Sequence, residues 1–247
     1  MTINSPVQTD MVTKITDSAL PFTTKYYEFT YDALDRKTEF THPEGWKEAW
    51  KYNSDGMVSV RRDVDGGLTE YGYDNYKRLS QIEDPWGNVT QYSYNTSSDN
   101  GPRNALKEIT FENSTKVQYT YNSLNRIDTI TNRASDNSIM TSFDYSYDSA
   151  GNIVLIDLNS GDAWHYRYDK IYQLTREARL NSLDQIQWSR TYSYDGAGNR
   201  EYLYYYDGST TTTTSYSYND LNQLTSRSNP NKTWGYDDNG NMIRHCV

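Results

Sequence analysis

The stretch YDSAGNIVLIDL, residues 147–158, decides the fold class because its phrase returns along the chain. It joins a Tyr-Asp pair, a short turn-like segment and an apolar alternating run. Aligning on an aromatic residue, any residue, Tyr and then Asp or Asn gives ten matches, and four of the nine spacings between successive tyrosines are 21 residues. This regularity indicates an internal repeat. The ten tyrosines are Tyr31, Tyr52, Tyr73, Tyr94, Tyr121, Tyr147, Tyr168, Tyr194, Tyr218 and Tyr236.

Each repeat is predicted to hold two antiparallel strands and two turns. The aromatic residue and the Tyr two positions later share one face of a strand, because side chains alternate with period two. The Asp or Asn that follows is suited to capping a turn with its own side chain. Three residues further on, Gly and Asn recur, which indicates a backbone position with positive φ. That position holds Asp35, Gly56, Lys77, Asn125, Gly151, Gly198, Asn222 and Gly240.

The repeats predict an all-β fold. About ten repeats of two strands each would form a curved or spiralling antiparallel β-shell segment, and a five-bladed β-propeller with two repeats per blade is the alternative. We expect a single domain over residues 1–247, with recognisable repeats over about 11–243. Polar loop insertions are expected near 96–105 and 207–215, the second with a hairpin-like tip at Asp207-Gly208.

The composition restricts the classes of partner. The chain has 25 Tyr and 6 Trp but only 35% hydrophobic residues, which favours thin, well-paired β-structure over a thick aliphatic core. A net charge of −9 without a basic run argues against nucleic acid and anionic lipid. No apolar stretch has the length of a membrane span, and no signal peptide is recognisable at the N-terminus. We expect the chain to be cytoplasmic when it is expressed by itself. It would be extracellular or lie at the cell surface if it is part of a larger exported protein.

The repeat resembles the YD repeat, also called the Rhs repeat, whose signature is Tyr-Asp-x-x-Gly-Asn/Arg-Leu/Ile. The segments YDSAGNI (147–153), YDGAGNR (194–200), YNDLNQL (218–224) and YDDNGNM (236–242) match it closely. YDNYKRL and YDKIYQL keep the ends of the motif and lose the glycine. The resemblance covers nearly the whole chain.

This resemblance implies a relation to bacterial Rhs and wall-associated proteins, cocoon components of insecticidal toxin complexes, and teneurin ectodomains. In those proteins a β-sheet strip spirals into a hollow shell, which in the bacterial members encloses a C-terminal toxin. The present chain departs from them in having only ten repeats and no toxin domain after Met242. The DPWG at 84–87 has the letters of the family's self-cleavage segment but lies where a turn of the array belongs.

Catalytic motifs are absent from the sequence. There is no Gly-x-Ser-x-Gly, and the single cysteine, Cys246, offers neither a disulfide framework nor a metal-ligand cluster. His42, His165 and His245 are scattered, and DVDGG (63–67) lacks the remaining ligands of a calcium loop. We therefore expect no cofactor and no metal. An Asp/Glu pair of a glycoside hydrolase is formally available, but the sequence does not identify its members.

Aromatic residues are the strongest chemical feature. Most are expected to form cross-strand ladders that hold the sheet together. Exposed rings near turns could instead stack on sugar faces, and the ligand-binding candidates are Trp86, Trp46, Trp164 and the neighbouring His165.

Three functions remain open. The first is a non-enzymatic structural and interaction module, a shell segment of an Rhs-like bacterial toxin or surface protein. Its partners would be neighbouring repeats, a second copy or an associated toxin domain, because open strand edges invite pairing. The second is a carbohydrate-binding module, and the third is a glycan-directed hydrolase. A buried carboxylate pair would favour the hydrolase, and a cleft lined by Trp without such a pair would favour the binding module.

Overall fold

A computed structural model describes residues 2–4, 11–16, 19 and 26–246. Every regular element in these residues is a β-strand, and neighbouring strands run antiparallel, as the sequence predicts. The chain divides into two compact units. Unit 1 comprises residues 1–117 and 134–137, and unit 2 comprises residues 118–133 and 138–247.

In unit 1 each strand pairs with the next along the chain, from β1 to β10. The strands are β1 (Thr2–Asn4), β2 (Lys14–Thr16), β3 (Tyr26–Tyr31), β4 (Lys37–Thr41), β5 (Lys47–Tyr52), β6 (Val58–Arg62), β7 (Leu68–Tyr73), β8 (Leu79–Glu83), β9 (Val89–Tyr94) and β10 (Leu106–Thr110).

Strand β11 (Lys116–Tyr121) spans the boundary between the units. In unit 2 the consecutive pairing runs from β12 to β22. Its strands are β12 (Ile127–Arg133), β13 (Ile139–Tyr147), β14 (Ile153–Leu158), β15 (Ala163–Tyr168), β16 (Leu174–Leu180), β17 (Ile186–Tyr194), β18 (Arg200–Tyr206), β19 (Thr211–Tyr218), β20 (Leu224–Arg227), β21 (Lys232–Tyr236) and β22 (Met242–Cys246).

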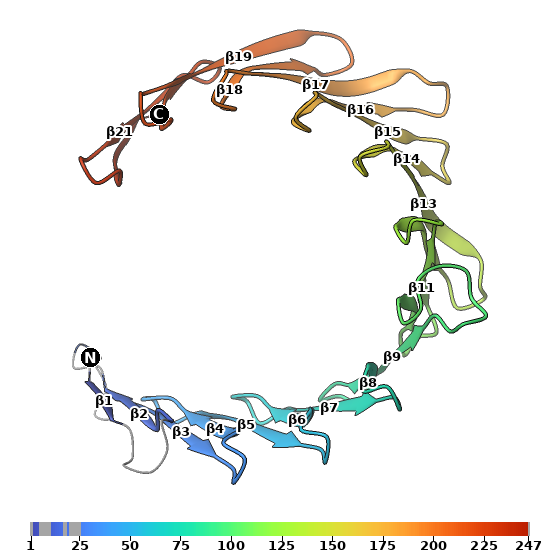
Figure 1. Ribbon diagram of the computed structural model, residues 1–247, viewed down its shortest axis with the longest axis vertical. Coiled ribbons are helices and arrows are strands. Elements are labelled where there is room, and N and C mark those ends of the chain that lie inside the picture. Colours follow the sequence, from blue (N-terminus) through green and yellow to red (C-terminus); the bar gives the residue numbers. More distant parts are fainter. Residues whose placement is uncertain (1, 5–10, 17–18, 20–25, 247) are drawn as a thin grey trace. The chain divides into compact units, whose positions relative to one another are not determined.

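The five-bladed propeller alternative is wrong. A propeller blade is a separate four-stranded sheet. In unit 2 the ladder runs through every strand from β12 to β22 without such a break. The strands of unit 2 follow a curve from β13 to β21 (Figure 1), so the prediction of a curved antiparallel segment is confirmed.

The motif turn forms as the sequence indicates. The backbone N–H of Asp148 donates to the carbonyl of Asn152, and the N–H of Gly151 donates back to the carbonyl of Asp148. Asp148 Oδ1 also accepts the N–H groups of Ala150 and Asn152, both at 2.9 Å. Gly151 has φ +95°, a conformation that favours glycine. The same position has positive φ in the other repeats, including those with Lys77 and Tyr172, except in the repeat that carries the loop of residues 96–105.

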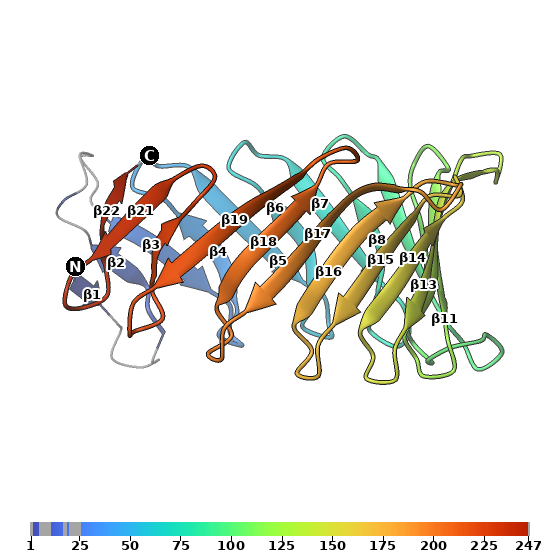
Figure 2. The same ribbon diagram turned by 90° about the horizontal axis from the view of Figure 1, so that it is seen from above.

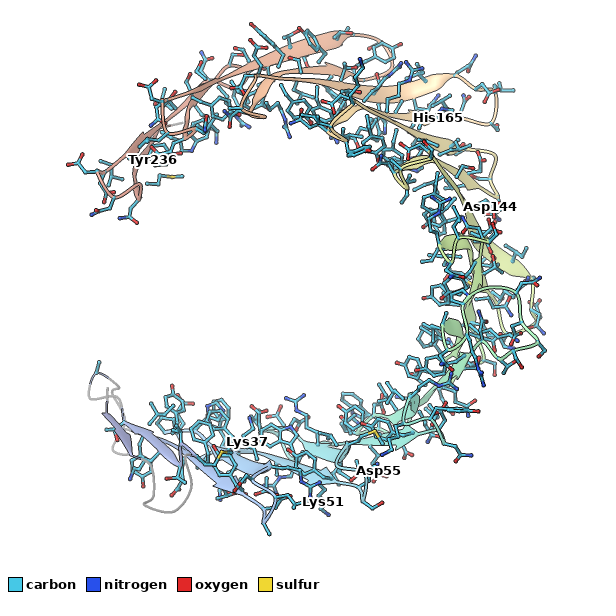
Figure 3. The ribbon with its side chains drawn as sticks, viewed as in Figure 1. Lys37, Lys51, Asp55, Asp144, His165 and Tyr236 are labelled. Atoms are coloured by element: carbon cyan, nitrogen blue, oxygen red, sulfur yellow. The ribbon has the colours of Figure 1, made fainter. Side chains whose placement is uncertain are left out.

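A bulge lies beside most of the motif turns. In the β13–β14 ladder the register shifts between Ser146 and Tyr147, so that Tyr147 pairs with Ile153. Tyr145, Tyr147 and their equivalents then point to one side, here named the aromatic face. Figure 3 shows this division in unit 2, where Tyr236 lies on the inner side of the curve and Asp144 and His165 lie on the outer side.

Each unit is a single layer of strands (Figures 1 and 2). A sheet in an ordinary domain buries one face against a second layer. In the described chain, by contrast, Ala163 and Ala178 are the only buried hydrophobic residues, and most of the aromatic rings are half-buried. Stability must therefore come from contacts within the layer, between neighbouring strands and side chains.

The two stretches expected as loop insertions differ in structure. Residues 96–105 form an extended loop that joins β9 to β10, closed by the N–H of Asn95 donating to the carbonyl of Ala105. In the second stretch only Asp207 to Thr210 forms a turn, and residues 211–215 belong to β19. The insertion therefore lengthens a hairpin.

Candidate functional site

The motif tyrosines link each repeat to the preceding one. The hydroxyl of Tyr147 donates to the carbonyl oxygen of Ile127 at 2.7 Å, and Ile127 lies six residues after the preceding motif tyrosine. The same six-residue relation holds for the bonds from Tyr52 to Lys37, Tyr73 to Val58, Tyr94 to Leu79, Tyr168 to Ile153, Tyr194 to Leu174 and Tyr236 to Leu224. The first motif tyrosine makes an equivalent bond to Val12.

The environment of these hydroxyls keeps them protonated. Burial among strands raises the pKa of Tyr73, Tyr94, Tyr147 and Tyr168 above the ordinary value of 10.0. In some repeats an arginine covers the ring: the guanidinium carbon of Arg126 lies 4.3 Å from the ring centroid of Tyr147. A cation over an aromatic face adds attraction to the packing. The aromatic face thus carries a ladder of rings and hydroxyl bonds.

The motif carboxylates are occupied by their turns. Asp74 Oδ1 accepts the N–H of Arg78 at 3.0 Å, while Oδ2 accepts from Arg78 Nε at 2.7 Å. The side-chain bond from Arg78 and the backbone N–H groups hold the pKa of Asp74 below its ordinary value. The pKa of Asp148 is lowered in the same way, first by the Asn152 amide. These carboxylates remain ionised acceptors that cap turns.

A charged cluster on the aromatic face was not predicted from the sequence. Glu177 on β16 accepts a 2.7 Å hydrogen bond from the Tyr192 hydroxyl and pairs with Arg190 Nη1 at 3.0 Å. Burial, followed by the bond to Glu177, raises the pKa of Tyr192 to about 12. No pattern in the sequence predicts this cluster, because Glu177 and Arg190 become cross-strand partners only once the register of β16 and β17 is set.

Trp46 lies in the β4–β5 turn of unit 1 and stacks on His42, with ring centroids 3.3 Å apart. The row continues through Phe40, whose ring centroid lies 4.2 Å from that of His42, to Phe29. The Trp46 indole N–H donates to Glu44 Oε2 at 2.5 Å. One face of this indole is therefore covered by the protein itself.

Of the other three candidates, Trp86 lies in a turn of unit 1, and Trp164 and His165 are consecutive residues of β15 in unit 2. Trp86 is 84% exposed at the β8–β9 turn, where Asp84 Oδ1 accepts its backbone N–H. Trp164 packs edge-on against Trp188 at 5.2 Å on the aromatic face of unit 2. His165 points to the opposite face, as its place in the strand predicts, and lines a shallow depression there. Trp46 and Trp86 lie on different turns of unit 1, and Trp164 and His165 point to opposite faces of β15, so neither unit brings two of these candidates into one cleft.

Within the described residues, no group of three His, Cys, Asp or Glu side chains is placed to hold a metal ion. Asp63 of the DVDGG segment serves its turn instead, accepting the N–H of Gly67 at 2.7 Å. The side chains of His245 and Cys246 lie outside the described part of the structure. Among the described residues, no helix has the length and apolarity needed to cross a membrane.

The sequence and the structure were compared with those of known proteins. No family model and no curated protein matches the sequence. The structure is similar to the crystal structure of TcdB2-TccC3, with a TM-score of 0.51 and 14% identity over 96% of this chain and 16% of that one. The same complex without its hypervariable C-terminal region gives a TM-score of 0.47 and 13% identity over 88% of this chain and 18% of that one. The crystal structure of a porin-like protein from Bacteroides uniformis gives a TM-score of 0.28 and 13% identity, over 90% of this chain and 87% of that one.

Only the first of these scores supports a shared fold. The chain therefore has the fold of part of a toxin-complex protein, and it spans 16% of the length of that protein. The likeness concerns the backbone, since the sequences are 14% identical.

Proposed function

We propose that this chain is a non-enzymatic structural module of the YD-repeat (Rhs-repeat) type, a shell segment of a larger toxin-related or surface assembly. The observation that carries the proposal is the hydroxyl bond from most of the motif tyrosines into the preceding repeat, for example from Tyr168 to Ile153 at 2.9 Å. Such a bond joins hairpins into a continuous sheet that needs no second layer. A continuous thin sheet is suited to forming a wall.

We expect the partners of such a module to pair with the edge strands of the sheet. In the described residues β1 pairs only with β2, and β22 pairs only with β21. An open edge presents unpaired N–H and C=O groups, which favour pairing with another strand. Neighbouring repeats or a second copy would extend the sheet there, and an associated toxin domain would lie against one of its faces.

Two features favour this role over an enzymatic one. The motif carboxylates are engaged in turns, as at Asp74 and Asp148. Glu177, the carboxylate set among the rings of the aromatic face, is paired with Arg190 rather than with a second carboxylate. Within each unit, the aromatic candidates for carbohydrate binding do not line one cleft, so no observation favours the second function.

The proposal can be tested by measuring whether copies of the chain associate through an edge strand. We expect the mass of the purified chain, measured by light scattering after gel filtration, to rise with concentration. Ile243→Lys places a charge on β22 and should reduce this association, because charged side chains blunt a sheet edge. Ile171→Lys is the matched control, since Ile171 is 71% exposed in a turn and Ile243 is 68% exposed. Equal association of both variants, or turnover of a glycoside substrate, would contradict the proposal.

A further inference from the structure

A groove crosses β15, β16 and β17 on the face opposite the aromatic face. Ala163, Ala178 and Ser189 lie on this face of the three strands and are 6%, 3% and 8% exposed. Small residues sit here among longer neighbours, and they leave a depression of about 150 Å³ beside His165, Arg167, Arg176, Leu180 and Ile186. Ala178, the most deeply buried of the described residues of unit 2, thus lies under an outward-facing hollow rather than in a core.

Two arginines stand directly opposite each other at one side of this groove. Arg167 on β15 and Arg176 on β16 are cross-strand partners in the ladder. Like charges in that position destabilise a sheet. Two other arginines of unit 2 have carboxylate partners: Arg179 pairs with Asp162 at 2.7 Å and Arg190 pairs with Glu177 at 3.0 Å. Among the described residues, no carboxylate forms an ion pair with Arg167 or Arg176, although Asp184 lines a neighbouring depression with Arg176.

Tyrosine side chains continue the groove toward β18. Arg176 pairs with Thr191, and Thr191 pairs with Tyr204, so these residues follow one row across the sheet. Tyr202 and Tyr204 are stacked at 6.1 Å on this outer face. Elsewhere the repeat motif places its tyrosines on the aromatic face. The second depression shares Arg176 and Ile186 with the first and also reaches Ser189 and Tyr206.

We propose that this groove binds an extended acidic peptide segment of a partner protein. A carboxylate of the peptide pairs with Arg167 and Arg176 and relieves their repulsion, since arginine forks match carboxylates well. An apolar side chain two residues away covers Ala178, Leu180 and Ile186. This apolar wall, with the net charge of −9 on the chain, favours a mixed acidic and apolar peptide over a polyanion such as nucleic acid. The proposal does not depend on the shell function.

Fluorescence anisotropy on the whole chain tests the groove. The probe is a fluorescein-labelled peptide, Gly-Ser-Glu-Ser-Val-Ser-Glu-Ser-Gly, in which Val lies two residues from each Glu, and the charge control carries Gln at each Glu. We expect Arg167→Gln/Arg176→Gln to weaken binding about tenfold or more, from the loss of charge-assisted hydrogen bonds. The matched variant Lys51→Gln/Arg103→Gln removes two exposed charges from unit 1 and should change the affinity less than about twofold. The Gln peptide should bind more weakly than the Glu peptide.

The same variant separates binding from folding. Because Arg167→Gln/Arg176→Gln removes a like-charge pair, its melting temperature should equal or exceed that of the parent chain. Weaker binding at an unchanged or higher melting temperature supports the proposal. Three results would overturn it: no saturable binding of the acidic peptide, equal loss of affinity in both double variants, or tighter binding of an oligothymidylate than of the peptide.

Discussion

The hydroxyl of Tyr147 donates to the carbonyl oxygen of Ile127, twenty residues earlier in the chain, at 2.7 Å. Tyr147 ends one strand, and Ile127 begins the second strand of the preceding repeat. The bond therefore ties one turn region to the neighbouring hairpin across the aromatic face. Its recurrence in the other repeats gives the single layer a cohesion that its small buried core does not provide.

Truncation of this ring should be costly. Tyr147→Ala removes the hydroxyl bond to Ile127 and the contact with Arg126, and we expect a loss of about 3 kcal/mol in the free energy of unfolding. Equilibrium urea denaturation followed by circular dichroism measures this loss. Leu183→Ala, at a residue 74% exposed in a turn, is the control and should change stability by less than about 0.5 kcal/mol. Equal stability of both variants would rule out a structural role for the ring.

Acid should weaken the fold through the turn carboxylates. The pKa values of Asp148, Asp195 and Asp237 are lowered, first by amide bonds from Asn152, Asn199 and Asn241. A lowered pKa in the folded state gives stability that is present above the unfolded value of 3.8 and lost as the pH falls through the folded value. We expect the urea midpoint to fall between about pH 5 and about pH 2.

A triple variant isolates that effect. Asp148→Asn/Asp195→Asn/Asp237→Asn keeps an acceptor for the backbone N–H groups, as Asn53 does natively by accepting from Met57 at 3.0 Å. The variant should therefore lose less stability on acidification than the parent chain. The same acid loss in both would show that the turn carboxylates do not cause it.

Alkali should also weaken the fold, in this case through the tyrosines. Burial raises the pKa of Tyr73, Tyr94 and Tyr147, and raises that of Tyr192 to about 12. Stability from such groups is present below the unfolded pKa of 10.0 and is lost as the pH rises through the folded values. We expect tyrosinate absorbance of the folded chain to rise at higher pH than that of the chain in urea. Superimposed titration curves would contradict this expectation.

The left-handed turn position can be tested at Gly151. Its φ is +95°, and a Cβ there would meet Arg126 Nη1 at 3.7 Å, an ordinary contact. Backbone strain rather than crowding is therefore the cost of substitution. Gly151→Val should destabilise by about 1–3 kcal/mol, whereas Gly151→Asn should cost less because Asn tolerates this region. Asn125, with φ 62°, holds the same position in the preceding repeat. Equal melting temperatures for the two variants would exclude strain as the cause.

The fold was predictable because its signals are local. The alternation of Tyr145 and Tyr147, the capping aspartate and the left-handed residue all act within a few residues of one another. The choice between a curved sheet and a propeller was not local. It depends on whether the second strand of one repeat pairs with the first strand of the next throughout the unit, and both architectures use the same turns.

The charged features of unit 2 were not predictable for a related reason. Glu177 meets Arg190, and Arg167 meets Arg176, only through the registers of β15, β16 and β17. The bulges beside the turns set these registers, and a shift of one residue would reverse the face of every side chain. Trp46 and Trp86 were recognised from the sequence as residues near turns, but the stacking of Trp46 on His42, which covers one face of its indole, was not predicted.

The most direct measurement compares two double variants by urea unfolding. Tyr147→Phe/Tyr168→Phe removes two hydroxyl bonds between repeats, whereas Tyr202→Phe/Tyr204→Phe removes two hydroxyls from the outer face. We expect the first to lose about 2 kcal/mol and the second to lose less than about 0.5 kcal/mol. Equal losses in the two variants would contradict the claim that the motif hydroxyls join the repeats into one layer.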